Sequence, residues 1–204
     1  MKENNWFDPF YIQSHLNEEE SNIQKNVRDF CNNELKPTVV ERNRKNEFDQ
    51  DLYPKFGSLG VLGQTVKTHG GSGTSNLAYG LVAYEFEKID SSYRSSISVQ
   101  SSLVIHPINE FGSQEQKDKY LPQLIKGEKI GCFGLTESEA GSDPASMKTS
   151  FKKTKDGYII NGSKNWITNA PIADIFIIWA IEENKDHKSI KGFKIEKNTE
   201  GLNT

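Results

Sequence analysis

Hydrophobic positions recur at helical spacing through most of the first 130 residues. Apolar side chains at positions 23, 27, 30, 31 and 35 are separated by polar ones, which predicts an amphipathic helix. Asn17 and Glu20, just before this stripe, have the pattern of a capping box. Pro37 interrupts the stripe, and we expect a second helix to start there with the proline in its first turn.

Further helical segments follow along this part of the chain. Residues 51–59 form a short amphipathic piece, residues 67–75 a glycine-rich loop, and the apolar stripe over 77–89 another helix. Residues 95–109 are apolar enough to predict a buried helix. Ser113 and Gln116 form a second capping box, and Gly127 is a typical helix stop.

The pattern changes near Lys129, where short strand-like runs replace the helical stripes. Strand candidates are residues 131–136, 158–160, 166–168, 175–181 and 192–195, with a hairpin over 151–161 that turns at 155–157. We therefore predict an α+β fold with a helical domain over residues 1–129 and a β domain over 130–204. The predicted sheet has open apolar edges, which native folds cover or close, so we expect the chain to be a fragment or the N-terminal part of a longer protein; the alternative is that a dimer partner covers the edges.

Composition narrows the function classes. The chain has 204 residues, of which 25 are basic and 28 acidic, giving a net charge of −3. This balance excludes the strongly basic footprint of a nucleic-acid-binding protein. The longest apolar run has seven residues, 175–181, whereas a membrane-spanning helix needs about 20. We therefore expect neither nucleic acid nor a membrane as a partner.

The two cysteines and the N-terminus bear on the compartment. Cys31 and Cys132 have no metal-binding spacing, so we predict no metal site, and two cysteines do not make a disulfide framework. A reducing, cytosolic compartment is the simplest interpretation. Residues 1–17 lack both the apolar core of a secretory signal and the arginines of an organelle transit peptide.

Two glycine- and hydroxyl-rich segments are candidates for ligand binding. Residues 131–143 follow a strand signal, and their small side chains let backbone N–H groups approach a ligand. The alternative is a plain β-turn. Residues 161–169 place Trp166 among polar residues, where its ring can stack on a flat cofactor. The alternative there is a strand with the tryptophan in the core.

A third candidate segment opens an otherwise apolar stretch. Arg94 stands among several serines in residues 92–98, and a guanidinium fork pairs well with a carboxylate. A helix N-terminus at this place also favours negative charge. The segment therefore predicts either an anion site or simply a helix cap with a surface arginine.

Taken in order, these segments resemble the acyl-CoA dehydrogenase family, and glutaryl-CoA dehydrogenases in particular. The general family motifs are matched by GLTE at 134–137, GSD at 141–143, NG at 161–162 and WIT at 166–168. The motifs of the glutaryl-CoA enzymes are matched by YRS at 93–95, SVQSSLV at 98–104, HPI at 106–108, FGS at 111–113 and KYLPQL at 119–124, and the opening Phe7-Asp8-Pro9 also fits. The resemblance covers essentially the whole chain.

The resemblance implies a fold and a set of site residues. The family has an N-terminal helical domain, a middle β domain that is antiparallel and barrel-like, and a C-terminal helical bundle, of which this chain holds the first and part of the second. The implied cofactor is FAD, with Thr136 hydrogen-bonded to the flavin ring and the Thr168 hydroxyl near the reactive flavin nitrogen. The implied FAD contacts are Phe133, Gly134, Leu135, Thr136, Gly141, Ser142, Trp166, Ile167 and Thr168. The implied substrate contacts are Arg94, Ser95, Ser98 and Ser142, with Arg94 pairing with the distal carboxylate of a glutaryl chain.

The implied reaction is α,β-dehydrogenation of glutaryl-CoA with decarboxylation to crotonyl-CoA, as in lysine and tryptophan degradation. Electrons would pass to an electron-transfer flavoprotein, and the full-length protein would form a homotetramer. The catalytic glutamate of the family lies in the C-terminal bundle, so we expect no catalytic residue within these 204 residues and no turnover by them alone. Glu137 and Glu139 lie in the flavin loop, and nothing aims either of them at an α proton.

Two alternatives stay open. In the first, the protein is another acyl-CoA dehydrogenase with a different substrate. In the second, it is a truncated, non-catalytic binding or assembly module that associates with a full-length paralogue. We expect a bacterial cytoplasmic location, with the mitochondrial matrix as the alternative because the family acts there in eukaryotes.

Overall fold

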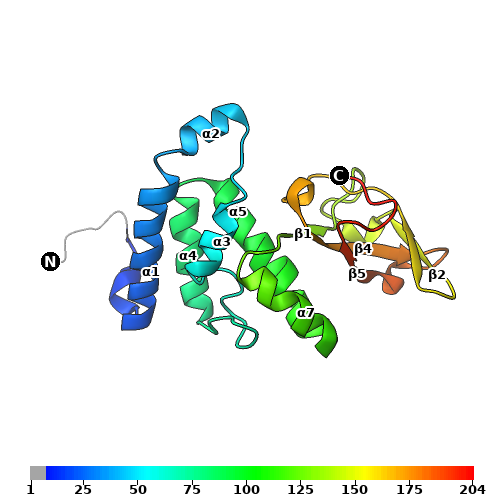
Figure 1. Cartoon of the computed structure of the whole chain (residues 1–204), viewed down its shortest axis with the longest axis horizontal. Coiled ribbons are helices and arrows are strands. Elements are labelled where there is room, and N and C mark those ends of the chain that lie inside the picture. The colour runs from blue at the N-terminus through cyan, green and yellow to red at the C-terminus, as the bar shows by residue number, and fades with distance from the viewer. Residues whose placement is uncertain (1–7) are drawn as a thin grey trace.

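The structure, a computed structural model, describes residues 8–204. Phe7, one of the residues that carry the resemblance, lies outside this range, as do the first residues of the segment considered as a targeting signal. Helices occupy the chain up to Ile125 and strands follow from Gly131, so the helical and β parts form the two ends of an elongated molecule (Figure 1). The expected order of a helical part followed by a β part is confirmed.

The helical part follows the predicted caps closely. Asn17 and Ser113 cap their helices, and Glu20 and Gln116 reciprocate in both capping boxes. The helices are α1 (Glu18–Phe30), α2 (Val39–Lys45), α3 (Leu52–Ser58), α4 (Asn76–Glu87), α5 (Ser91–Ser98), α6 (His106–Phe111) and α7 (Gln114–Ile125), with 3₁₀ turns such as Ile12–His15 and π-helical segments at Cys31–Leu35 and Val99–Ile105. Among the described residues, no helix is long and apolar enough to cross a membrane.

One of the two predicted helix boundaries, at Gly127 and Pro37, differs from the structure. Gly127 adopts φ 72° just after α7, the left-handed conformation that typically ends a helix. Pro37 lies two residues before α2 and not inside its first turn, because the chain continues from α1 through the π-helical segment to Leu35 before it breaks. The expectation for Pro37 was therefore wrong by a few residues.

The expected buried helix over residues 95–109 lies within a continuous helical run from Ser91 to Phe111, formed by α5, the π-helical segment and α6. Gln100, fully buried in this run, donates through Nε2 to the carbonyls of Leu124 (2.9 Å) and Lys129 (2.8 Å). Its Oε1 accepts the N–H of Gly131 at 2.8 Å. All its hydrogen bonds thus tie the end of α7 and the start of the sheet to this helix.

One apolar core runs from the helices into the sheet. In the helical part, the ring of Phe56 packs edge-on against Phe30 and Phe86, with centroids 6.0 and 5.3 Å apart. The same buried cluster includes Ile175 and Ile177 of the sheet. The sheet is therefore fixed directly onto the helices that precede it.

The sheet is mixed, which corrects the expected antiparallel arrangement. It contains β1 (Gly131–Gly134), β2 (Ser150–Lys153), β3 (Tyr158–Asn161), β4 (Ile175–Glu182) and β5 (Lys191–Glu196). The predicted β2–β3 hairpin is antiparallel, as is the β4–β5 pair. β1 and β2, however, pair in parallel with successive parts of β4. The parallel start is fixed where the carbonyl of Ile130 accepts the N–H groups of Asp174 (2.7 Å) and Ile175 (3.1 Å).

Residues 166–168 do not form the expected strand. They lie in the loop between β3 and a 3₁₀ turn at Ala170–Ile172. Trp166 has φ 59° and Asn169 has φ 70°, whereas strand residues have strongly negative φ. The strand prediction for this segment was therefore wrong, and so was the alternative that placed Trp166 in the core, because its side chain is 93% exposed.

A polar cluster joins α7 to β5. The hydroxyl of Tyr120 donates to the carboxylate of Glu196, which also accepts from Lys119 (3.0 Å) and Lys194 (3.3 Å). The hydrogen bonds from Tyr120 and Lys119 lower the pKa of Glu196 to about 2. This cluster is a second connection between the helical part and the sheet, at the surface.

Candidate functional site

The two glycine- and hydroxyl-rich segments lie against each other. The 135–142 loop follows β1, and the 162–169 loop follows β3. The backbone N–H of Asn165 donates to the carbonyl of Thr136 at 2.9 Å, and its side-chain amide donates to the hydroxyl of Ser138 at 2.9 Å. The amide of Asn169 reaches back to the carbonyl of Gly131 at 3.1 Å. Residues far apart in sequence therefore form a single two-loop surface.

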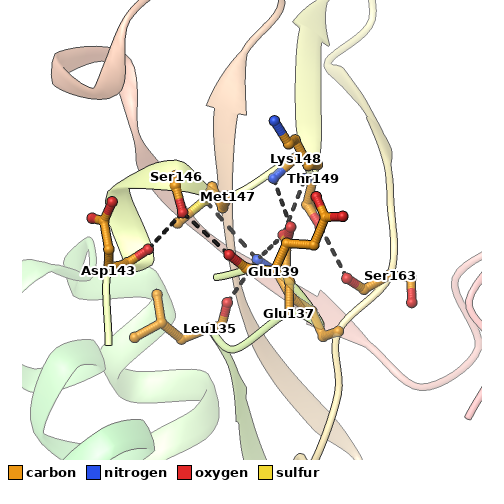
Figure 2. Close-up of polar contacts among 10 residues, drawn as sticks. Leu135, Glu137, Glu139, Asp143, Ser146, Met147, Lys148, Thr149 and Ser163 are labelled. Atoms are coloured by element: carbon orange, nitrogen blue, oxygen red, sulfur yellow. Dashed lines mark hydrogen bonds and ion pairs between the residues drawn. The ribbon is translucent and has the colours of Figure 1, made fainter. Parts of the chain in front are cut away.

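A buried ion pair lies beneath this surface. Lys164 Nζ is 2.7 Å from Glu137 Oε1, and the two side chains are only 8% and 7% exposed. Lys164 also donates to the carbonyl of Leu135 at 3.0 Å. The Glu137 carboxylate accepts the backbone N–H groups of Lys148 (2.6 Å) and Thr149 (3.0 Å), as Figure 2 shows. Each carboxylate oxygen thus has at least one donor.

The protonation state of Glu137 follows from these contacts. Burial alone would raise the pKa of its carboxyl group, but the hydrogen bonds from Lys164, Thr149 and Lys148 outweigh burial and lower the pKa to about 2. At neutral pH, Glu137 is therefore an ionised carboxylate that already accepts three hydrogen bonds. Glu139, two residues later, is exposed.

Three hydroxyl groups of the two loops make no hydrogen bond within the described chain, and two of them, on Ser142 and Thr168, belong to exposed residues. Within residues 8–204, the hydroxyls of Thr136, Ser142 and Thr168 have no hydrogen-bond partner. Trp166 exposes 93% of its side chain and holds a left-handed backbone conformation that is rare for a bulky residue. Strained, exposed aromatic residues of this kind are typical of functional sites. Trp166 lies close in the chain to Thr168 and directly follows Asn165, which bonds to Thr136, so an aromatic face with hydroxyls nearby fits a flat ligand that is rich in hydrogen-bond acceptors.

The other candidate residues of these loops differ in what they expose. Phe133 packs edge-on against Trp179, with ring centroids 5.9 Å apart, and Ile167 packs onto a small buried cluster around Cys132 and Phe176. The carbonyl of Leu135 is used by Lys164. The side chains of Phe133 and Ile167 therefore support the loops from inside, and a ligand on the outer side would meet their backbone.

Two glycines of the first segment have different explanations. A Cβ at Gly134 would lie 2.5 Å from Ile178 Cδ1, so the end of the Ile178 side chain would have to move to make room for it. A Cβ at Gly141 would meet nothing within 4 Å, and its φ lies outside the left-handed region. Nothing in the described chain requires glycine at 141, which is what a closely approaching ligand would explain.

Arg94 projects from α5 and is already paired. Its Nε is 2.7 Å from Glu87 Oε2, and its Nη1 lies 3.4 Å from the hydroxyl of Ser98. The Arg94 side chain remains 37% exposed, and its Nη2 has no partner among the described residues. The hydrogen bonds from Arg94 and Ser91 lower the pKa of Glu87. Glu87 was not among the residues predicted from the sequence, where its only signal is an acidic residue at the end of α4, seven positions before Arg94.

A cleft brings the serine-rich helix to the second loop. It has a volume of about 610 Å³ and is lined by four serines of α5 together with the Thr168–Ile172 region and the Asn46–Phe48 turn. Ser95 and Thr168 line this cleft together, whereas Arg94 is not among the described residues that do. The structure thus unites one substrate candidate with one cofactor candidate across the junction of the two parts.

Family profiles match nearly all of the chain. The profile described as "Acyl-CoA dehydrogenase, N-terminal domain" matches residues 17–128, and the one described as "Acyl-CoA dehydrogenase, middle domain" matches residues 132–204. A short-chain specific acyl-CoA dehydrogenase of Clostridium acetobutylicum is 39% identical over 189 residues, which are 92% of this chain and 50% of that protein. The mitochondrial isovaleryl-CoA dehydrogenase of Bos taurus is 40% identical over 168 residues, which are 81% of this chain and 39% of that protein.

Solved structures of acyl-CoA dehydrogenases are similar to this chain in fold as well as in sequence. A glutaryl-CoA dehydrogenase of Mycobacterium smegmatis in complex with FADH2 superposes with a TM-score of 0.90 at 40% identity, covering 94% of this chain and 49% of that one. The butyryl-CoA dehydrogenase of Megasphaera elsdenii superposes with a TM-score of 0.83 at 38% identity, covering 91% of this chain and 50% of that one. The chain spans about half the length of several curated relatives that it matches.

Proposed function

The chain belongs to the acyl-CoA dehydrogenase family, and we propose that the protein catalyses FAD-dependent α,β-dehydrogenation of an acyl-CoA thioester, with glutaryl-CoA as its substrate. The observation that carries this proposal is the two-loop surface, on which partner-free hydroxyls stand beside an exposed tryptophan. This donor set suits an isoalloxazine ring and its flanking phosphates better than it suits a plain protein surface.

Each loop has its own role in the proposed FAD site. Thr136 and Thr168 would donate hydrogen bonds to the ring system, and Trp166 would cover one part of it. Ser142 and the open backbone at Gly141 would meet the pyrophosphate or the CoA side. When bound, FAD supplies the acceptor for the hydride removed from the acyl chain, while the protein orients and polarises the reactants. Phe133, Gly134, Leu135 and Ile167 would contribute backbone and support.

The acidic residues of the loops are not the base in this proposal. Glu137 is buried, ionised and hydrogen-bonded at both carboxylate oxygens, so it neither reaches a ligand nor has a pKa suited to proton abstraction near neutral pH. We propose that the general base comes from sequence outside these 204 residues, as the family resemblance implies. The role that these residues take is therefore to bind and orient.

Arg94 supports glutaryl-CoA as the substrate. A carboxylate moved out of water needs a charged, forked partner, and Arg94 offers the unpaired Nη2 on a partly exposed guanidinium. Ser98 lies within reach of the same guanidinium, and Ser95 lines the neighbouring cleft. Glu87 orients the arginine through Nε and leaves Nη2 to face a second carboxylate.

The test is a substrate panel on the protein purified as its gene encodes it. Reduction of an artificial electron acceptor would be followed with glutaryl-CoA, butyryl-CoA and isovaleryl-CoA, using Arg94→Met and the control Lys55→Met, which removes a remote surface cation paired with Glu34. For Arg94→Met, we expect kcat/KM to fall roughly 30-fold or more with glutaryl-CoA and much less with the other two. Equal losses on all three substrates would refute the role of Arg94.

A second candidate function is oxidation of an uncharged acyl-CoA. Its specific support is that a short-chain enzyme and an isovaleryl-CoA enzyme are as similar to this chain as the glutaryl-CoA enzyme is. A protein that prefers butyryl-CoA or isovaleryl-CoA and tolerates Arg94→Met would fit this candidate. No reduction with any acyl-CoA would contradict both.

The remaining parts of the proposal concern organisation. We place the domain division between residues 129 and 130. We expect an electron-transfer flavoprotein to be the physiological electron acceptor, and we expect the full-length protein to form a homotetramer. Oxidation of glutaryl-CoA would be coupled to decarboxylation, which release of CO2 during turnover would test.

A further inference from the structure

We propose that Glu137 and Lys164 are positioning residues, whose buried ion pair fixes the separation of the two cofactor loops. This inference rests on the proposed FAD site and goes beyond it, because neither side chain belongs to that site. Both lie beneath the surface on which a ligand would rest, each with less than a tenth of its side chain exposed.

The pair connects three separate parts of the chain. Glu137 belongs to the 135–142 loop, and its carboxylate accepts the N–H groups of Lys148 and Thr149 at the entry to β2. Lys164 belongs to the 162–169 loop and donates to the carbonyl of Leu135 as well as to Glu137. The hydroxyl of Thr149 in turn donates to the carbonyl of Ser163 at 3.4 Å. One ion pair therefore sets the relative position of both loops and a strand end.

The neighbours of the pair are the proposed ligand contacts. Thr136 directly precedes Glu137, and Trp166 follows Lys164 by two positions. Glu137 is buried, whereas Thr136 beside it is half-buried and its hydroxyl has no partner within residues 8–204. A change in the Nζ–Oε1 distance of 2.7 Å would therefore move Thr136 relative to Trp166 and Thr168. Among residues 8–204, the other hydrogen bonds between the two loops are neutral ones from Asn165, and a further neutral one runs from Asn169 to Gly131 of β1; such bonds are individually weaker.

The charged character of the pair points to positioning and not to stability alone. A buried ion pair is seldom more stable than an apolar pair of similar size, because desolvation opposes the attraction between the charges. An apolar pair would fill the space but would impose no fixed distance or direction. The charge-assisted hydrogen bonds do impose them, and the ligand surface above requires such a fixed geometry.

The test separates affinity for FAD from stability. Variants Glu137→Gln, Lys164→Met and the double variant would be compared with Glu85→Gln, a matched control. Glu85 is a carboxylate that is 1% exposed and paired with Arg28 at 2.9 Å in the helical part, far from the loops in sequence. The readouts are the FAD dissociation constant from flavin fluorescence quenching, the visible circular dichroism of bound FAD, and thermal unfolding of the FAD-free protein.

We expect both single variants to be less stable and to bind FAD roughly tenfold more weakly, as when one or two hydrogen bonds to a ligand are misaligned. The double variant buries no unpaired charge, so it should regain part of the stability while FAD binding stays weak and the dichroism stays altered. Glu85→Gln should lose stability and keep the affinity of the unmodified protein.

The outcomes that count against the inference are distinct. If the double variant regains the FAD affinity together with the stability, or if all variants bind FAD as the unmodified protein does, the pair has no positioning role and the proposed function stands. If the unmodified protein binds no FAD, the proposed function fails and this inference fails with it.

Discussion

Replacing Lys164 by methionine provides a direct test of how the two-loop site is held together. The substitution keeps a long, flexible side chain but removes the ammonium group 2.7 Å from Glu137. Glu137 then remains buried with only the backbone N–H groups of Lys148 and Thr149 as partners. We expect a large loss of stability, since a buried charge has lost its counter-ion.

Two independent arguments give the magnitude. Removing one partner of a buried pair typically costs about 3–5 kcal/mol. The pKa of Glu137 is lowered from its ordinary value of 4.5 to about 2 by Lys164 together with Thr149 and Lys148 against the opposing effect of burial, which corresponds to about 3 kcal/mol of net stabilisation at neutral pH from these contacts together. Because two backbone donors stay in place, we expect the lower end, about 3 kcal/mol. For a chain of this length, that lowers Tm by roughly 6–12 °C.

The pH dependence of this loss has a definite sign. In the unmodified protein, the lowered pKa of Glu137 contributes stability that is present above pH 4.5 and is lost as the pH falls toward about 2. In Lys164→Met, the pKa of Glu137 is higher, because burial remains and the cation is gone. The difference in stability between the variant and the unmodified protein therefore narrows as the pH falls from the higher pKa of Glu137 in the variant toward its pKa of about 2 in the unmodified protein.

The assay is urea unfolding followed by circular dichroism at pH 7 and at about pH 3.5. Lys55→Met serves as the control, because its partner Glu34 is exposed and its removal should change little. We expect the gap between Lys164→Met and the unmodified protein to narrow at the lower pH. A gap below about 1 kcal/mol at pH 7, or one that is the same at both pH values, would refute this account of the pair.

Two further predictions concern glycines and the junction. Gly141→Ala should change the free energy of unfolding by no more than about 0.5 kcal/mol but weaken FAD binding, whereas Gly131→Ala, whose Cβ would lie 2.4 Å from Val104 Cγ1, should lower the free energy of unfolding by about 1–3 kcal/mol. Urea unfolding and FAD titration of both variants check this, and a destabilised Gly141→Ala would contradict it. Tyr120→Phe removes the hydroxyl that donates to Glu196 and should lower the unfolding free energy by about 1 kcal/mol in urea titrations, with an unchanged value counting against the junction cluster.

Features set by neighbouring residues could be predicted from the sequence. Asn17 with Glu20, and Ser113 with Gln116, form their capping boxes because donor and acceptor are three positions apart on the same helix. The β2–β3 hairpin formed where a turn signal stands between two strand-like runs. In each case, the interaction that decides the structure lies within a few residues.

Features set by distant residues could not be predicted in this way. Trp166 read as part of a strand, but the hydrogen bond from Asn165 to Thr136 and the ion pair of Lys164 hold it in a loop with φ 59°. The parallel pairing of β1 with β4 depends on the junction at Ile130 and Asp174, which no local pattern reveals. Glu87 was missed for the same reason, since its link to Arg94 crosses a helix boundary.

The helical run from Ser91 to Phe111 explains why the fold alone does not decide the substrate. Its inner face carries Gln100 and Ser101, whose hydrogen bonds fix the helix to α7, to β1 and to the Val61–Gly63 turn. Its outer face carries Arg94 and Ser98, whose contacts stay within α4 and α5. The outer face can therefore change without disturbing the scaffold, so relatives with different acyl substrates keep the same architecture. Substrate choice has to be tested at Arg94, because the buried half of this run makes its hydrogen bonds with the scaffold of the chain itself.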